Sequence, residues 1–145
     1  MSVPLVCELM RIMNKILKKA NQETSPMRGL LYMSYGKPRK EENLVGYLTS
    51  IRGRLPNDRE VEGLRHRYRL IGQFQDGMSP LNRMMTAQGQ DLVEILNRRA
   101  GSNRWTLYEG YKHMEPSIED ALQAMYDDGI HHCTALVAEP FDSNL

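Results

Sequence analysis

Hydrophobic positions along the chain form three short apolar runs, separated by segments in which apolar residues recur with a helical period. The runs cover residues 29–35, 105–111 and 133–138, and Gly, Pro or charged residues bound each of them. Such runs are typical of buried β-strands. Three helical blocks lie between the first two runs and one lies between the last two, an order that predicts an α/β domain with parallel strands and right-handed crossovers.

The helical blocks begin and end at residues that favour helix termini. The expected helices run from Arg39 to Ile51, from a cap at Asn57 or Asp58 to Gly72, from Ser79-Pro80 to about Arg99, and from Glu115-Pro116 to Gly129. In the second block, Val61, Leu64, Tyr68 and Ile71 recur at spacings of three and four. This spacing puts them on one helix face.

A further amphipathic helix is predicted over residues 1–22, where Leu5, Leu9, Ile12 and Ile16 share one face. A linker to residue 28 follows, so the predicted units are residues 1–28 and a lobe of residues 29–145. The favoured interpretation is a helix that packs on the lobe or on a partner, with a surface-binding or targeting helix as the alternative. No apolar run is long enough to predict a membrane span.

Composition narrows the class of protein. With 145 residues, 41% of them hydrophobic, the chain fits one globular domain with a sizeable core. The net charge of +1 predicts no polyanionic partner, so nucleic acid is not expected. Cys7 and Cys133 are far apart and lack metal-ligand spacing, which predicts reduced, mostly buried thiols in a cytoplasmic protein.

Candidate site residues follow the predicted strands. Tyr35, His113 and Glu139 each come at the end of a strand, and the carboxyl ends of parallel strands meet at one edge of a sheet. His131 and His132 precede the third strand and are expected at the opposite edge. A group of arginines adds a second feature, because guanidinium groups pair well with carboxylates or phosphates; it comprises Arg52, Arg54, Arg65, Arg67 and Arg69.

Several ordered motifs resemble the ferrochelatase family, in particular its coproporphyrin-dependent bacterial type. They are Gly-Leu-Leu-Tyr-Met-Ser-Tyr-Gly-Lys-Pro at 29–38, Ile51-Arg52, Arg-Tyr-Arg-Leu-Ile-Gly at 67–72, Ser79-Pro80-Leu81, and Gly-Tyr-Lys-His-Met-Glu-Pro-Ser-Ile-Glu-Asp-Ala at 110–121. The resemblance covers residues 29–138 and implies a doubly wound, flavodoxin-like parallel-sheet lobe. It corresponds to the N-terminal lobe only, because the chain ends before the second lobe, which carries the iron-handling histidine and glutamate.

The resemblance also implies a function in haem biosynthesis. A protein of this type is a lyase that binds a porphyrin, coproporphyrin III or protoporphyrin IX, for the insertion of ferrous iron. Porphyrin and iron are substrates, and no cofactor is expected. By matching positions, the porphyrin-binding residues would be Tyr35, Ile51, Arg52, Arg67, Tyr68, Ser79 and His113, and Tyr35 would reach the metal axially. A phenolic oxygen is a known axial ligand of haem iron. No catalytic residue is assigned.

Three functions remain open from the sequence. The chain could be active as an enzyme when a second copy or a separate lobe supplies the other wall, as in the homodimers of small cobalt chelatases. It could instead be a non-catalytic tetrapyrrole-binding lobe or a truncated inactive fragment. A phosphate- or nucleotide-binding domain using the arginine group is the third alternative, although no glycine-rich phosphate loop supports it.

Overall fold

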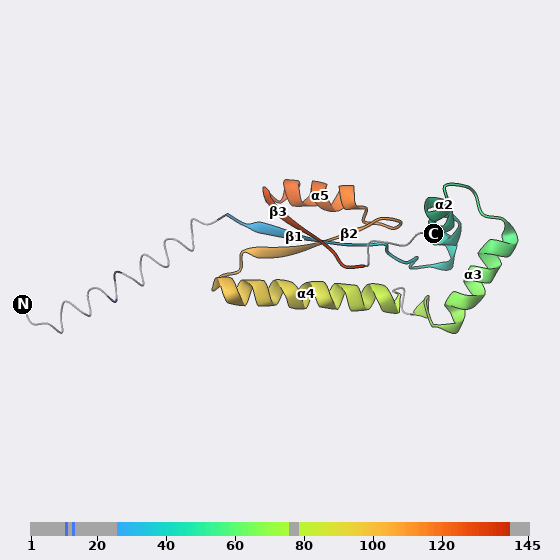
Figure 1. The fold of residues 1–145 in the computed structure, drawn as a ribbon, viewed down its shortest axis with the longest axis horizontal. Helices are drawn as coiled ribbons and strands as arrows, with labels where there is room; N and C mark the ends of the chain where they lie inside the picture. The colour runs from blue at the N-terminus through green and yellow to red at the C-terminus, as the bar shows by residue number, and fades with distance from the viewer. Residues whose placement is uncertain (1–10, 12, 14–25, 76–78, 140–145) are drawn as a thin grey trace, which may run out of the picture.

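The computed structural model describes residues 11, 13, 26–75 and 79–139 (Figure 1). Three parallel strands, β1 (Arg28–Ser34), β2 (Trp105–Tyr111) and β3 (His132–Val137), form one sheet in the order β2-β1-β3. The three predicted strands are confirmed to within one or two residues. From β1 the chain crosses to β2 on one side, and from β2 it crosses back over β1 to β3 on the other side. The first strand is therefore central. The helix predicted over residues 1–22 lies almost entirely outside the described residues.

The helices are a 3-10 turn, η1 (Glu41–Asn43), and α2 (Leu44–Arg52), α3 (Asp58–Leu70), α4 (Pro80–Ala100) and α5 (Ile118–Asp127). Figure 1 shows α4 and α5 on opposite faces of the sheet, with α2 and α3 beyond the end at which β1 and β2 finish. The predicted doubly wound α/β lobe is therefore confirmed. The pair α2 and α3 is the part of the fold that surrounds the carboxyl ends of the strands.

Two hydrophobic clusters hold these layers. One lies between the sheet and α5 and contains Leu31, Tyr108, Ala121, Met125 and Ile130, all at most 9% exposed. The other joins α2 to α3 through Leu44, Tyr47, Leu48, Val61 and Leu64. Burial of such side chains stabilises a fold by roughly 1.5–3 kcal/mol for each large residue. The second cluster fixes α2 and α3 as one unit beside the strand ends.

Side-chain caps define where the helices begin. The Asn57 side chain accepts a hydrogen bond from the Glu60 N–H at the start of α3, as the sequence predicted. The expectation that a helix begins at Glu115-Pro116 is wrong by about two residues. Ser117 caps α5 instead, because its hydroxyl accepts from the Asp120 N–H at 3.0 Å.

The single helix expected from Arg39 to Ile51 is also wrong in its first turn. That turn is the 3-10 segment η1, and the α-helix proper begins at Leu44. It ends at Gly53, whose φ of 67° is a left-handed conformation that glycine adopts readily.

Strand β3 is exposed, with only Val137 partly buried. Among the described residues, only β1 pairs with it, so one of its edges is open. Cys133 lies on this strand and is exposed, so the expectation of a buried thiol is wrong for it, while Cys7 falls outside the described residues. An apolar sequence indicates burial when the strand is central in the sheet. It does not do so for an edge strand that has little packed against it.

Candidate functional site at the carboxyl ends of the strands

Tyr35 and His113 follow neighbouring strands and lie against each other. The His113 N–H donates to the carbonyl oxygen of Tyr35 at 3.1 Å, and the Lys112 N–H donates to that of Ser34 at 2.9 Å. These bonds extend the β1–β2 ladder past the strands themselves. The two rings stack with centroids 5.5 Å apart and planes inclined by 11°. The prediction that these two strand ends meet at one edge is confirmed.

The end of the third strand reaches the same place. The Tyr35 N–H donates to Glu139 Oε2 at 2.9 Å, so the carboxylate after β3 binds the backbone after β1. A cavity of about 250 Å³ opens between them, and Ile118 and Lys112 contribute to its walls. The Nζ of Lys112 lies 5.4 Å from the centroid of the Tyr35 ring, within the range of a cation–π interaction.

The two histidines before β3 lie elsewhere. His132 pairs in the sheet with Arg28, the first residue of β1, so it lies at the amino end of the strands. His131 precedes it in the chain. Their predicted position at the opposite edge of the sheet is confirmed.

His113 connects the strand ends to helix α2. Its Nδ1 lies 2.9 Å from the Ser50 hydroxyl, and the Tyr47 ring meets it edge-on at 6.4 Å. Burial lowers the pKa of His113, and the positive charges of Lys112 and Lys37 lower that pKa further. The imidazole is therefore neutral near pH 7, so it holds Ser50 through an uncharged hydrogen bond.

Arg52 lies at the end of α2, in an ion-pair group with Arg54 and Glu60. Both guanidinium groups contact the Glu60 carboxylate, with Arg54 Nη2 at 2.7 Å from Oε1. Glu60 also accepts from the Asn57 N–H at 2.9 Å. The hydrogen bond from Arg54, followed by that from Asn57, lowers the pKa of Glu60 to about 2. Two cations on one anion leave an excess of one positive charge, beside Ile51, which is 46% exposed.

Sequence reasoning missed Glu60 as part of the site. A signal was present, since Asn57 and Glu60 have the three-residue spacing of a capping box. That spacing predicts the bonds to the backbone of α3. It does not predict that the same carboxylate gathers two arginines from the preceding turn.

The sequence matches a known protein family. The family model described as Ferrochelatase matches residues 27–145. The chain belongs to the ferrochelatase family. It is 43% identical to the coproporphyrin III ferrochelatase of Anoxybacillus flavithermus over 113 residues, which are 77% of this chain and 35% of the relative. The corresponding protein of Bacillus mycoides is 46% identical over 113 residues, again 77% and 35%.

A third relative, the coproporphyrin III ferrochelatase of Staphylococcus saprophyticus, is 40% identical over 117 residues, which are 80% of this chain and 37% of that protein. The chain thus spans about a third of the length of these curated relatives. The residues that the family model matches, 27–145, include β1, β2 and β3.

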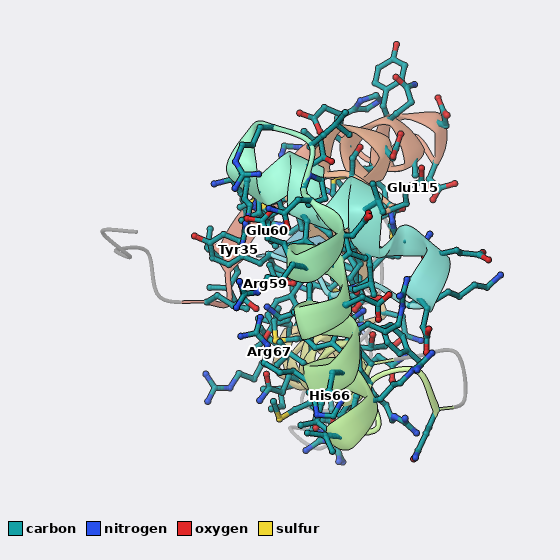
Figure 2. The ribbon with its side chains drawn as sticks, turned by 90° about the vertical axis from the view of Figure 1, so that its right-hand side faces the viewer. Tyr35, Arg59, Glu60, His66, Arg67 and Glu115 are labelled. Atoms are coloured by element: carbon teal, nitrogen blue, oxygen red, sulfur yellow. The ribbon has the colours of Figure 1, made fainter. Side chains whose placement is uncertain are left out.

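The other predicted site residues of the ferrochelatase-family lobe lie around α3 and the start of α4. The hydroxyls of Tyr68 and Tyr47 are hydrogen-bonded, and burial, followed by the Tyr47 contact, raises the pKa of Tyr68. Arg67 is exposed on α3. Figure 2, which looks onto α3, shows Arg67 and Tyr35 toward one side of that helix and Glu115 toward the other.

Ser79 has a structural role in this conformation. Its residue is fully buried, and its hydroxyl accepts from the Asn82 N–H at 3.1 Å to cap α4. The structure therefore does not bring the Ser79 hydroxyl to the Tyr35–His113 pair. Ser79 is closed to solvent, unlike the other predicted site residues, which are partly or fully exposed.

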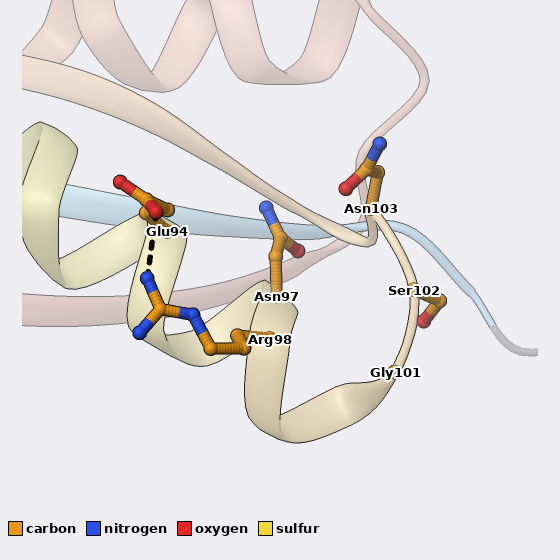
Figure 3. Close-up of a pocket in the computed structure, with 6 residues that line it drawn as sticks. All are labelled: Glu94, Asn97, Arg98, Gly101, Ser102 and Asn103. Atoms are coloured by element: carbon orange, nitrogen blue, oxygen red, sulfur yellow. Dashed lines mark hydrogen bonds and ion pairs between the residues drawn. The ribbon is translucent and has the colours of Figure 1, made fainter.

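A cavity at the opposite end of α4 contains none of the predicted site residues (Figure 3). Its volume is about 540 Å³, and Asn97 at its wall binds the turn that leads into β2. The Asn97 Oδ1 accepts from the N–H groups of Arg104 and Trp105, both at 2.8 Å. Arg98 is paired with Glu94 at 2.6 Å. These contacts assign Asn97, Arg98 and Glu94 to the fold, while the buried Ser102 hydroxyl at the same cavity has no hydrogen-bond partner among the described residues.

The part of the chain that the structure describes contains neither a cluster of metal ligands nor a membrane-spanning helix. Among these residues, no three His, Cys, Asp or Glu side chains gather in a way that could hold a metal ion. Within the same part of the chain, none of the helices has both the length and the apolar character needed to cross a bilayer.

Proposed function

We propose that this ferrochelatase-family lobe binds a porphyrin, coproporphyrin III or protoporphyrin IX, for ferrous iron insertion in the haem biosynthesis of the cytoplasm. The binding surface is the edge at which β1 and β2 end. One observation carries the proposal: the contact series Tyr35–His113–Ser50 joins that edge to the helix that ends in Ile51 and Arg52. An aromatic surface and an accessible guanidinium thus belong to one continuous region.

The residue types suit the two parts of a porphyrin. The stacked rings of Tyr35 and His113, with the exposed Ile51, offer a flat apolar surface for the macrocycle. Arg52 and Arg54 offer forked donors with an excess positive charge for a propionate. Arg67, which is exposed on α3, and Tyr68 are proposed as further porphyrin contacts by their matching positions in the family. The phenolic oxygen of Tyr35 is the proposed axial ligand of the iron.

Iron insertion also requires that two pyrrole N–H protons leave the ring as Fe²⁺ takes their place. In this proposal the lobe binds and orients the porphyrin from one side, and His113 keeps the Tyr35 ring in place. The other side of the ring needs a second wall. In this proposal a second copy of the chain or a separate complementary lobe supplies it.

The proposal is tested by mixing the purified chain with coproporphyrin III and Fe²⁺ without oxygen, while absorption, porphyrin fluorescence and molecular mass are recorded together. We expect porphyrin binding, iron-dependent loss of fluorescence, and a mass above that of one chain. Binding without chelation indicates a non-catalytic tetrapyrrole-binding lobe. The absence of any porphyrin binding overturns the proposal.

A pair of arginine variants makes the test specific. Arg52→Ala removes one donor of the proposed propionate contact and should weaken porphyrin binding about tenfold, the usual loss for a charge-assisted hydrogen bond. Arg69→Ala removes the same charge from α3, where Arg69 pairs with Glu41 at 2.6 Å. This control should bind porphyrin as the wild type does. Equal weakening in both variants would indicate a general charge effect instead.

A further inference from the structure

The backbone around Lys37 is held against helix α4 by buried amides. The Lys37 N–H donates to Asn82 Oδ1 at 3.2 Å, and Asn82 Nδ2 donates to the Lys37 carbonyl at 2.9 Å. Asn82 is 3% exposed. Gln73, 2% exposed, donates from Nε2 to the carbonyl of Pro38 at 3.0 Å. These hydrogen bonds hold the backbone of Lys37 in place, and its side chain extends from this fixed backbone.

The ammonium group of Lys37 lies beside two tyrosines. Its Nζ donates to the Tyr47 hydroxyl at 3.2 Å and lies 5.9 Å from the centroid of that ring. The Tyr47 hydroxyl is in turn hydrogen-bonded to that of Tyr68. No carboxylate in the described part of the chain forms an ion pair with Lys37, whereas carboxylates pair with Lys40, Arg52, Arg54, Arg65, Arg69 and Arg98. An ammonium has three donors, so two remain for a ligand.

Lys37 also lines a cavity of about 370 Å³, which we call the Lys37 pocket. It is lined by Lys37, Tyr68, Ile71, Gln73, Pro80, Leu81 and Met84. Ile71 is 63% exposed and Met84 is 51% exposed, so apolar surface is open to solvent here. A cation at one side and apolar walls on the others fit an apolar molecule that carries a carboxylate.

We propose that the Lys37 pocket is a second carboxylate subsite, separate from the Arg52 and Arg54 group, and that it binds one carboxylate of the porphyrin through the Lys37 ammonium. The apolar walls then contact the adjacent edge of the macrocycle. This inference rests on the proposed porphyrin-binding function and adds a specific contact to it.

The test is a fluorescence titration of coproporphyrin III with the full chain and a set of lysine variants. Lys37→Met removes the charge and should weaken binding about tenfold, as expected for the loss of a charge-assisted contact. Lys37→Arg keeps a cation and should keep most of the affinity. Lys40→Met is the matched control, because Lys40 is three residues away, 69% exposed at its side chain, and paired with Glu42. It should bind as the wild type does.

A fourth variant separates ligand binding from packing. Tyr47→Phe removes the hydroxyl that Lys37 contacts but leaves the ammonium, so it should bind porphyrin far better than Lys37→Met. If Tyr47→Phe and Lys37→Met weaken binding equally, Lys37 acts only through the internal hydrogen bond and the inference is overturned. Equal effects of Lys37→Met and Lys40→Met overturn it as well.

The same titration distinguishes this inference from the function on which it rests. Wild-type chain that binds no porphyrin overturns the proposed function and the subsite together. Wild-type binding that Lys37→Met leaves unchanged overturns the subsite alone. Thermal unfolding of each variant shows whether a change in affinity comes with a change in folding.

Discussion

The imidazole of His113 lies parallel to the phenol ring of Tyr35 and is bonded to Ser50, so one side chain joins two strand ends to helix α2. This arrangement leaves the rings as a flat surface whose position depends on the sheet register. In that register Ser34 is opposite Tyr111, which places the following residues, Tyr35 and Lys112-His113, side by side. The aromatic surface is therefore a consequence of parallel pairing.

Tyr35→Phe tests the axial-ligand assignment without disturbing the stack. The variant keeps the ring that contacts His113 but removes the only oxygen that can reach iron from that side chain. We expect porphyrin affinity to change by less than about threefold, or under 1 kcal/mol. The phenolate-to-iron charge-transfer absorption of bound ferric coproporphyrin should disappear. An identical spectrum in variant and wild type would remove Tyr35 as the ligand.

His113 predicts a pH dependence of stability. Burial and two nearby lysines lower its pKa in the folded chain below the ordinary value of 6.5. The unfolded chain therefore takes up a proton first as pH falls, so the folded state loses stability below about pH 6.5. Urea unfolding at pH 7.5 and 5.5 should show this loss in the wild type and a smaller one in His113→Asn.

The assignment is checked directly by following the ring protons of His113 by NMR. They should titrate below pH 6.5. A titration above that value would contradict the predicted direction, whatever the urea experiments show.

Glu60→Gln should reduce stability above about pH 4.5 and strengthen anion binding. The Glu60 carboxylate has a pKa lowered to about 2 by Arg54, Asn57 and Arg52, so its contribution is present above about pH 4.5 and is lost as pH falls toward 2. Glutamine keeps the capping geometry but not the charge. The melting temperature of the variant should be lower than that of the wild type at pH 6, and the difference should shrink near pH 2.

The same variant changes the charge beside Ile51. With the carboxylate removed, Arg52 and Arg54 are no longer neutralised in part, so coproporphyrin should bind more tightly at low salt. Added salt should remove this gain, because exposed charges are screened. A gain that persists at high salt would point to a change of shape.

Gly110→Ala should destabilise the lobe. A Cβ at this buried strand position would lie 2.9 Å from the Cα of Ile118, so the start of α5 must move. Overpacking of this kind costs about 1–3 kcal/mol. Gly63→Ala is the control, since nothing lies within 4 Å of a Cβ there and alanine favours a helix by about 1 kcal/mol. Thermal unfolding should show a lower midpoint for the first variant and a higher one for the second.

Much of this fold could be predicted because its signals are local. The apolar runs at β1, β2 and β3 and the caps Asn57 and Ser79 follow from residues within a few positions of one another. The site was harder to predict. Whether Ser79 faces a ligand or the inside of the lobe depends on how α4 meets the chain after β1, and the structure buries it. The motif alone could not distinguish these roles.

The sequence by itself determined the strands, the helices between them and the resemblance of the chain to ferrochelatases, because periodicity, caps and motifs are properties of neighbouring residues. Only the tertiary structure decided which side chains meet. The stack of Tyr35 on His113 depends on strand order, whereas the shared use of Glu60 by two arginines and the contact of Lys37 with Tyr47 depend on how the turns place the neighbouring helices. Residues distant in the chain are brought together by burial of apolar surface, and no local pattern records that pairing.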